Sequence, residues 1–292
     1  MAIGFRFGIS THLFHEQPLE RAHLADIAAA GFDLIELFAT RSHIDYRDAA
    51  RTAEIRGWLD ELGLTAWSMH APITDSFGGS APGRSFSIGA RDPAARDEAL
   101  AETTAAIEAA VTLGVSVLVL HPGAPGTGGS SGENDPTAVR RGLTAVSRAC
   151  RDAGLQLALE NIPNDLATAA ALVDWLEADL DPPPAGVCFD TGHAHLVDGV
   201  DRAIDLLAGT IVTTHVHDNR GQADDHLVPF GGTVDWRSAL FALVKTGYAG
   251  PLVFELPSHG DAARTLAAAV SARGRFQAIL DELAAPFPFE EA

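Results

Sequence analysis

The sequence of 292 residues predicts a single-domain (β/α)₈ barrel, a closed sheet of eight parallel strands surrounded by helices. Eight short apolar runs recur along the chain, and alanine-rich stretches of helical character separate them. Four of these stretches end directly before a glycine, a residue that commonly terminates helices: Gly31, Gly63, Gly114 and Gly154. Repeated strand and helix units of this kind fit one barrel domain over residues 1–292.

The apolar runs are interpreted as the strands of the barrel. Each is rich in Val, Ile, Leu or Phe and shows little alternation with polar residues, as expected for parallel strands that are covered on both faces. The expected strands lie at 5–10, 33–39, 65–70, 115–121, 155–160, 185–190, 211–217 and 251–256.

The stretches between the strands are interpreted as helices. They are expected at 18–30, 94–113, 165–178, 200–208, 235–246 and 261–284. Two further helices are expected to end at residues 62 and 153. An open, doubly wound sheet is the alternative, and it is less favoured because no G-x-G-x-x-G follows the first strand. The glycine-rich segment 122–135 is either a mobile loop over the site or only a flexible connection.

Composition excludes several classes of protein. No apolar run is long enough to cross a bilayer, and the first residues do not resemble a signal peptide, so we expect a soluble cytoplasmic protein. The two cysteines, Cys150 and Cys188, lie far apart, which argues against a disulfide scaffold or a thiolate metal site. The net charge of −19 provides no positive field to attract DNA, and this argues against a nucleic-acid partner.

Carboxylates and imidazoles stand at the C-terminal ends of successive expected strands. The carboxyl ends of barrel strands meet at one mouth, so residues that are distant in sequence become neighbours there. Gathering so many ionisable groups is costly unless a cation compensates them. The sequence therefore predicts a metal site built from residues at or just after these ends: His70, His121, Glu160, Asp190, His193, His215 and Glu255.

The segment 214–227, THVHDNRGQADDHL, is the richest part of the chain in metal-ligand chemistry. His215 and His217 stand two residues apart and therefore point to the same side of the seventh strand. Asp224 and His226 follow in the loop over the same mouth, where they are candidates for a further metal or for substrate. We interpret His217 as a residue that supports the ligands or lies at the surface.

Four residues around the mouth receive other interpretations. His195 is expected to support the ligands or to lie at the surface. Glu36, inside the second strand, is expected to be the buried partner of an arginine, with a substrate contact as the alternative. His12, after the first strand, and Arg220, after the seventh, are candidate substrate contacts.

These motifs together resemble the xylose-isomerase-like TIM-barrel superfamily, which includes the sugar phosphate isomerase/epimerase group and endonuclease IV. The resemblance covers nearly the whole chain, from GIST at 8–11 to FELP at 254–257. It is carried by MHAP at 69–72, LHPG at 120–123, LEN at 159–161, FDTGH at 189–193, HVHDN at 215–219, DDHL at 224–227 and FEL at 254–256.

The epimerase branch of this resemblance implies one divalent cation, Mn²⁺, Co²⁺, Mg²⁺ or Zn²⁺, held by Glu160, Asp190, His215 and Glu255. The cation would bind a carbonyl and an adjacent hydroxyl of a small sugar, polyol or sugar derivative and stabilise an enediolate. Glu160 and Glu255 would move the proton, and His193 would hydrogen-bond the substrate. A dehydratase or lyase that uses the same enediolate chemistry is an alternative.

The endonuclease IV branch implies three zinc ions and cleavage of a phosphodiester. The implied ligands are His70 and His121 for one zinc, Glu160 as a bridge, Asp190, His215 and Glu255 for the second, and His193, Asp224 and His226 for the third.

Two positions distinguish the branches. Endonuclease IV proteins typically carry DTCH and HLND, whereas this chain has Gly192 and His217 at the differing positions. These differences and the negative charge favour the isomerase or epimerase branch, although that group often has GEG at 231–233, where this chain has GGT. A sugar-binding relative without catalysis is a third alternative, and a homo-oligomer stays open.

Overall fold

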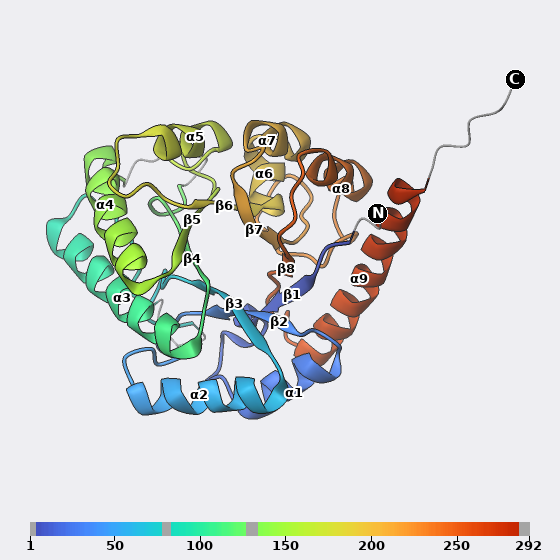
Figure 1. The fold of residues 1–292 in the computed structure, drawn as a ribbon, viewed down its shortest axis with the longest axis horizontal. Coiled ribbons are helices and arrows are strands. Elements are labelled where there is room, and N and C mark those ends of the chain that lie inside the picture. The colour runs from blue at the N-terminus through green and yellow to red at the C-terminus, as the bar shows by residue number, and fades with distance from the viewer. Residues whose placement is uncertain (1–3, 78–82, 127–133, 286–292) are drawn as a thin grey trace, which may run out of the picture.

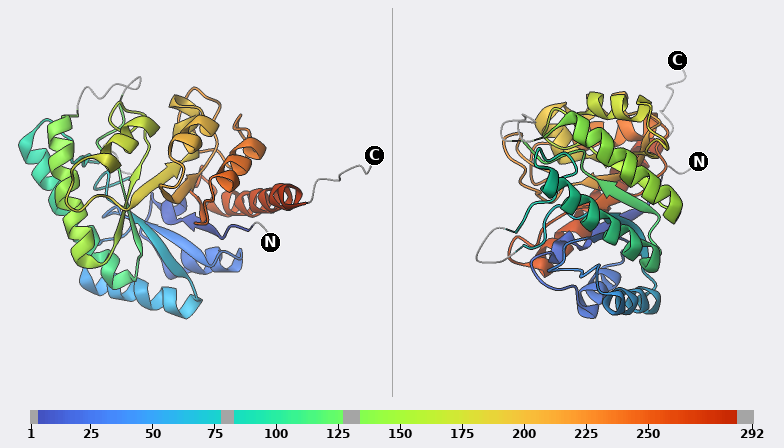
Figure 2. Two further views of the ribbon diagram at one scale, coloured as in Figure 1. Left: turned by 45° about the horizontal axis from the view of Figure 1, so that its top comes forward. Right: turned by 90° about the vertical axis from the view of Figure 1, so that its left-hand side faces the viewer.

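The computed structural model describes residues 4–77, 83–126 and 134–285. Within these residues eight parallel strands close into a barrel in sequential order, and helices surround it (Figures 1 and 2). The strands are β1 (Phe7–Ser10), β2 (Leu34–Phe38), β3 (Thr65–His70), β4 (Val117–Leu120), β5 (Gln156–Glu160), β6 (Gly186–Asp190), β7 (Ile211–Val216) and β8 (Leu252–Phe254). The predicted (β/α)₈ class is confirmed. Each strand lies within its expected range.

The helices also follow the predicted order. They are α1 (Arg21–Ala29), α2 (Ala49–Leu62), α3 (Pro93–Leu113), α4 (Pro136–Ala153), α5 (Ala169–Glu177), α7 (Val200–Leu206), α8 (Trp236–Lys245) and α9 (Ala262–Ala284). Gly63, Gly114 and Gly154 end three of them in the left-handed conformation, at φ 67°, 71° and 75°. Glycine adopts this conformation without the steric cost that a β-carbon brings.

Two short elements at the mouth were not predicted from the sequence. A 3₁₀ helix, η1 (Thr11–Phe14), follows β1, and α6 (Thr191–Val197) follows β6. The side chain of Asp190 accepts a hydrogen bond of 2.7 Å from the backbone N–H of His193 and thereby caps α6. Because α6 begins directly at the strand end, it places His193 at the mouth.

Strand register brings the expected residues to one level. Asp190 of β6 pairs with His215 of β7. Glu160 of β5 pairs with Cys188, which stands two residues before Asp190 in β6. His121 and Glu255 lie one residue beyond β4 and β8, so these two strands end earlier than expected. Below the site, the barrel interior is filled by Val117, Val119, Ala158 and Cys188, with Trp67 and Val212 packed against them.

The loop after β7 is anchored by one buried carboxylate. Asp218 accepts hydrogen bonds from the backbone N–H of Phe230 (2.9 Å), from that of Val234 (3.1 Å) and from the Trp236 indole N–H (2.9 Å). Its backbone also exchanges two hydrogen bonds with Leu227. Both ends of the segment that carries Asp224 and His226 are therefore tied to Asp218.

Two other expectations concern segments outside the barrel. The glycine-rich segment 122–135 falls partly outside the described residues, because 127–133 are not among them. In the described part of the chain, none of the helices combines the length and the apolar character that crossing a membrane requires.

We expect Asp218→Ala to lower the free energy of unfolding by about 3 kcal/mol or more, because four donors, including the backbone N–H of Asn219, lose their acceptor and each such loss costs roughly 1–3 kcal/mol. The midpoint of denaturant unfolding measures this change. Asp225→Ala alters the same loop and leaves these bonds intact, so it is the control. Equal midpoints for the two variants would contradict the anchoring role.

Candidate metal centre

Four buried side chains meet at the centre of the mouth. Glu160, Asp190, His215 and Glu255 each offer one ligand atom, and these four atoms lie within 4.8 Å of one another. His215 Nδ1 is 3.2 Å from Glu160 Oε1, 3.6 Å from Glu255 Oε2 and 3.9 Å from Asp190 Oδ2. Three carboxylates and one imidazole in this arrangement suit a divalent cation. We call these four residues the central group.

Glu36 determines which nitrogen of a neutral His215 ring carries the proton. His215 Nε2 lies 3.0 Å from Glu36 Oε2, which also accepts a hydrogen bond of 2.8 Å from the Ser68 hydroxyl. A proton on Nε2 that is donated to Glu36 leaves the lone pair of Nδ1 directed at the three carboxylates. Nδ1 is buried and makes no hydrogen bond, as expected of a nitrogen that is available to a metal. The central group therefore fits a cation.

The expectation that Glu36 pairs with an arginine is wrong. The carboxylate points into the barrel, where β3 and β7 present Ser68 and His215. Glu36 is fully buried. Burial raises its pKa, but His215 outweighs this effect and lowers the pKa below its usual range.

Electrostatics holds two of the central carboxylates, Glu160 and Asp190, in their charged form. Burial raises the pKa of Glu160, but the imidazoles of His215 and His121 outweigh burial and hold the pKa well below its usual range. Burial likewise raises the pKa of Asp190, and His193 and His217 lower it below its usual range. Charged carboxylates are the form that binds a metal, and a cation can replace the protons on the surrounding imidazoles.

A second group shares Glu160 with the first. His70 Nε2 and His121 Nε2 each lie 3.2 Å from Glu160 Oε2, and the two ring nitrogens are 3.2 Å apart. His70 Nδ1 lies 2.7 Å from the Ala71 carbonyl oxygen, which can only accept. The proton of a neutral His70 ring therefore sits on Nδ1, and Nε2 is free to bind a metal.

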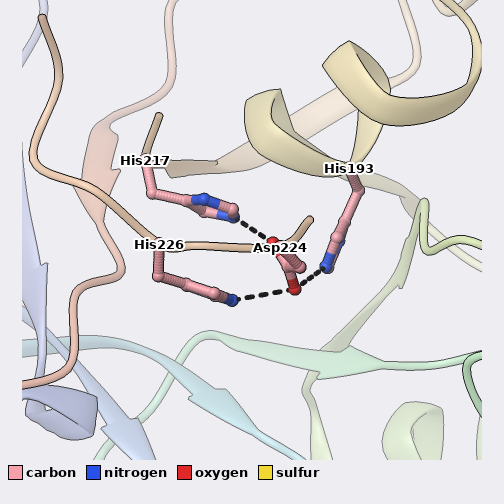
Figure 3. A group of neighbouring side chains, drawn as sticks. All are labelled: His193, His217, Asp224 and His226. Carbon is pink, nitrogen blue, oxygen red and sulfur yellow. Dashed lines mark hydrogen bonds and ion pairs between the residues drawn. The ribbon is translucent and has the colours of Figure 1, made fainter. Parts of the chain in front are cut away.

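A third group lies between α6 and the loop after β7, and Figure 3 shows its four side chains. His193 Nε2 and His226 Nε2 lie 3.0 and 3.1 Å from Asp224 Oδ2, and His217 Nε2 lies 3.9 Å from Asp224 Oδ1. Of the two interpretations of His217, the surface position is wrong, because the ring is fully buried. Its Nε2 lies 2.9 Å from Asp190 Oδ2, a contact that fits a residue supporting a ligand, and the ring also borders the third group.

The remaining candidates lie around the groups. The ring of His12 is 5.6 Å from that of His226 and 4.6 Å from that of Phe38, so it borders the mouth. Arg220 is exposed and donates to the Gly231 carbonyl at 3.5 Å, outside all three groups. Substrate contact by these two residues stays a prediction. His195 lies 2.9 Å from the Thr233 hydroxyl, outside the ligand groups.

An open hollow of about 570 Å³ lies beside the third group. Its lining includes Pro125, Pro163, His193, Gln222 and Asp224. A space of this size accepts a small molecule, and the loop after β7 forms one of its walls.

We expect Glu36→Gln to weaken metal binding at the central group about 10- to 100-fold, the usual effect of losing a partner that orients a ligand. The amide is neutral and no longer stabilises the His215 tautomer whose Nδ1 faces the carboxylates. Competition with a chromophoric chelator measures the affinity. Glu102→Gln, which changes another buried carboxylate, bonded to Tyr46, is the matched control. Equal affinities for both variants would refute the orienting role of Glu36.

Comparisons with known proteins agree with this fold. One curated relative is the uncharacterised protein y4fM of Sinorhizobium fredii, 33% identical over 160 residues, or 52% of this chain and 50% of that protein. The alignment thus spans about half the length of y4fM. The uncharacterised protein MJ1311 of Methanocaldococcus jannaschii is 25% identical over 277 residues, or 90% of this chain and 87% of that protein.

Solved structures share the fold at low sequence identity. A D-tagatose 3-epimerase-like protein has a TM-score of 0.76 and 23% identity, covering 96% of this chain and 100% of its own. A D-psicose 3-epimerase has a TM-score of 0.72 and 20% identity, and the match covers 94% of this chain and 99% of that structure. A family model described as xylose isomerase-like TIM barrel matches residues 24–275. The chain therefore belongs to the xylose isomerase-like TIM-barrel family.

Proposed function

We propose that this protein is a divalent-metal-dependent isomerase or epimerase of a small sugar, polyol or sugar derivative. The central group carries the proposal, since it combines a four-donor cation site with two glutamates. Glu160 ends β5 and Glu255 follows β8, three strands further around the barrel, so they approach the site from different sides. The shared fold with a D-psicose 3-epimerase supports the substrate class.

The residues of the central group and their neighbours have separate roles in the proposed reaction. A bound divalent cation supplies Lewis acidity, which makes the proton beside a substrate carbonyl more acidic. Glu160 and Glu255 then take that proton from one face and return a proton from the other, or to the neighbouring carbon in an isomerisation. Glu36 holds the His215 ring in place during both steps. His193 lines the hollow, and in a chain whose third group holds no metal its Nε2 can donate a hydrogen bond to a substrate oxygen.

We expect Glu160→Gln and Glu255→Gln each to slow the exchange of substrate hydrogen with solvent deuterium at least about 100-fold, because an amide cannot act as the general base. Proton NMR of D-psicose or D-tagatose incubated in heavy water with the metal-saturated protein measures this rate. Glu102→Gln serves as the control for removal of a buried carboxylate. Undiminished exchange in both site variants would rule out the two-glutamate mechanism.

Removal of the metal by a chelator should abolish the same exchange, and adding back Mn²⁺, Co²⁺, Mg²⁺ or Zn²⁺ should restore it. A dehydratase or lyase would instead give a product of lower mass, which mass spectrometry distinguishes from an isomer. A sugar-binding relative without catalysis would return the sugar unchanged and without deuterium.

A second candidate function is a multinuclear phosphodiesterase. The observation in its favour is the presence of two further groups built from imidazoles and carboxylates, one of which shares Glu160 with the central group. The net charge of −19 disfavours DNA as the substrate.

Our first proposal predicts that the zinc-loaded protein leaves an abasic DNA duplex and bis(p-nitrophenyl) phosphate intact. Gel electrophoresis and release of nitrophenol measure the two reactions. Cleavage that is lost in His70→Ala would favour the phosphodiesterase, because His70 belongs only to the second ligand group.

A further inference from the structure

We propose that His193, His217, Asp224 and His226 bind a zinc ion in a closed, structural site, and that Gly192 is the residue that admits His217 to it. This site differs from the set of three ligands that the resemblance implies, because a fourth side chain from the end of β7 completes it. The proposal does not depend on which reaction the central group catalyses.

The hydrogen bonds of two rings leave their Nε2 atoms facing the same carboxylate. His193 Nδ1 lies 2.9 Å from the Asn161 carbonyl oxygen, and His226 Nδ1 lies 3.2 Å from the Glu255 carbonyl oxygen. A carbonyl only accepts, so in each neutral ring the proton is on Nδ1 and the lone pair is on Nε2. In both rings the nitrogen that can bind a metal therefore faces Asp224 Oδ2, and a cation can take the place of the protons that these two contacts otherwise share (Figure 3).

His217 is placed to supply the fourth donor. Its ring is fully buried, and its Nε2 lies 3.9 Å from Asp224 Oδ1 and 2.9 Å from Asp190 Oδ2. The ring stacks on that of His226, with 3.8 Å between centroids and 12° between planes. Two protonated imidazoles would repel each other in this stack, whereas two neutral rings can bind one cation between their nitrogens and Asp224.

Gly192 makes this position of His217 available. A β-carbon at 192 would lie 2.8 Å from His217 Nε2 and closer still to Cε1 and Nδ1 of that ring. Gly192 is the second residue of α6, where alanine would favour the helix more than glycine does. The close approach of the imidazole explains a glycine at this position, and it couples residues 192 and 217.

The number of donors determines the kind of site. Structural zinc sites have four protein ligands in a tetrahedron, whereas catalytic sites keep one position for water or substrate. Here three imidazoles and one carboxylate occupy all four positions. The site is therefore expected to hold structure and to leave the chemistry to the central group.

The proposed zinc ion would stabilise the loop after β7. His193 lies in α6 and His217 directly follows β7, so both belong to the framework, whereas Asp224 and His226 belong to the loop. His226 has φ of 45°, a left-handed conformation that costs a non-glycine residue about 1 kcal/mol or more and needs support from its surroundings. A zinc ion that joins loop and framework supplies this support and fixes one wall of the adjoining hollow.

Metal content is the first test. The protein is stripped with a chelator, reloaded with Zn²⁺ alone, dialysed and analysed by mass spectrometry. We expect one zinc ion fewer per chain in both His217→Phe and Gly192→Ala than in the unaltered protein. His195→Ala is the matched control, because this nearby histidine bonds Thr233 outside the group. Unchanged zinc content in both variants, or an unaltered protein without zinc, would overturn the proposal.

Substitution with Co²⁺ tests whether the site is closed. A tetrahedral Co²⁺ site absorbs visible light more strongly than a six-coordinate one, so the spectrum of the unaltered protein should lose its tetrahedral bands in His217→Phe. Azide should leave these bands unchanged, because no coordination position is free. Bands that shift with azide, or that persist in His217→Phe, would show that His217 does not complete the site.

The structural role is tested by amide hydrogen exchange over residues 221–229. Zn²⁺ should slow exchange at least about 10-fold in the unaltered protein and in His195→Ala, but not in His217→Phe or Gly192→Ala. Glu255→Gln removes a central ligand and should keep the zinc-dependent protection of the loop, so failure of the catalytic proposal remains distinguishable. Equal exchange with and without zinc in the unaltered protein would refute the structural role.

Discussion

Buried carboxylates require nearby positive charge, and the arrangement of the barrel mouth depends on this requirement. Burial alone raises the pKa of Glu36, Glu160 and Asp190, yet imidazoles around them lower all three values. The strand ends provide the framework, because parallel strands deliver these groups to one level of the barrel. Protonated imidazoles neutralise these carboxylates. When a metal supplies the positive charge instead, the same imidazoles can lose their protons and bind the metal as ligands.

Sequence reasoning predicted the barrel and the residues that meet at its mouth, because both follow from strand periodicity and from the convergence of strand ends. It failed where side-chain direction or close packing decides the outcome. The predicted arginine partner of Glu36 is wrong, because the sequence does not show that the Glu36 side chain faces His215 across the barrel interior. The burial of His217 depends on the missing β-carbon of Gly192, a contact between separate strands and helices. The helix α6 is too short for its periodicity to be recognised.

The same mouth contains more than one group of side chains that could bind a metal. Glu160 belongs both to the central group and to the group with His70 and His121, so the occupancy of these two groups cannot be independent. A cation in one withdraws charge from the carboxylate that the other needs. Fold similarity does not decide between the reactions, because function depends on the sites that a fold carries.

The hydrogen bonds of Asp218 turn the segment between β7 and α8 into a ring closed on a single side chain. The part of this ring at 220–223 is exposed. Residues could be inserted there without moving the anchor or the barrel strands, and exposed positions of this kind usually tolerate insertions. Natural variants and designed libraries can therefore vary the length of this segment to reshape the entrance for different ligands while the barrel keeps its stability.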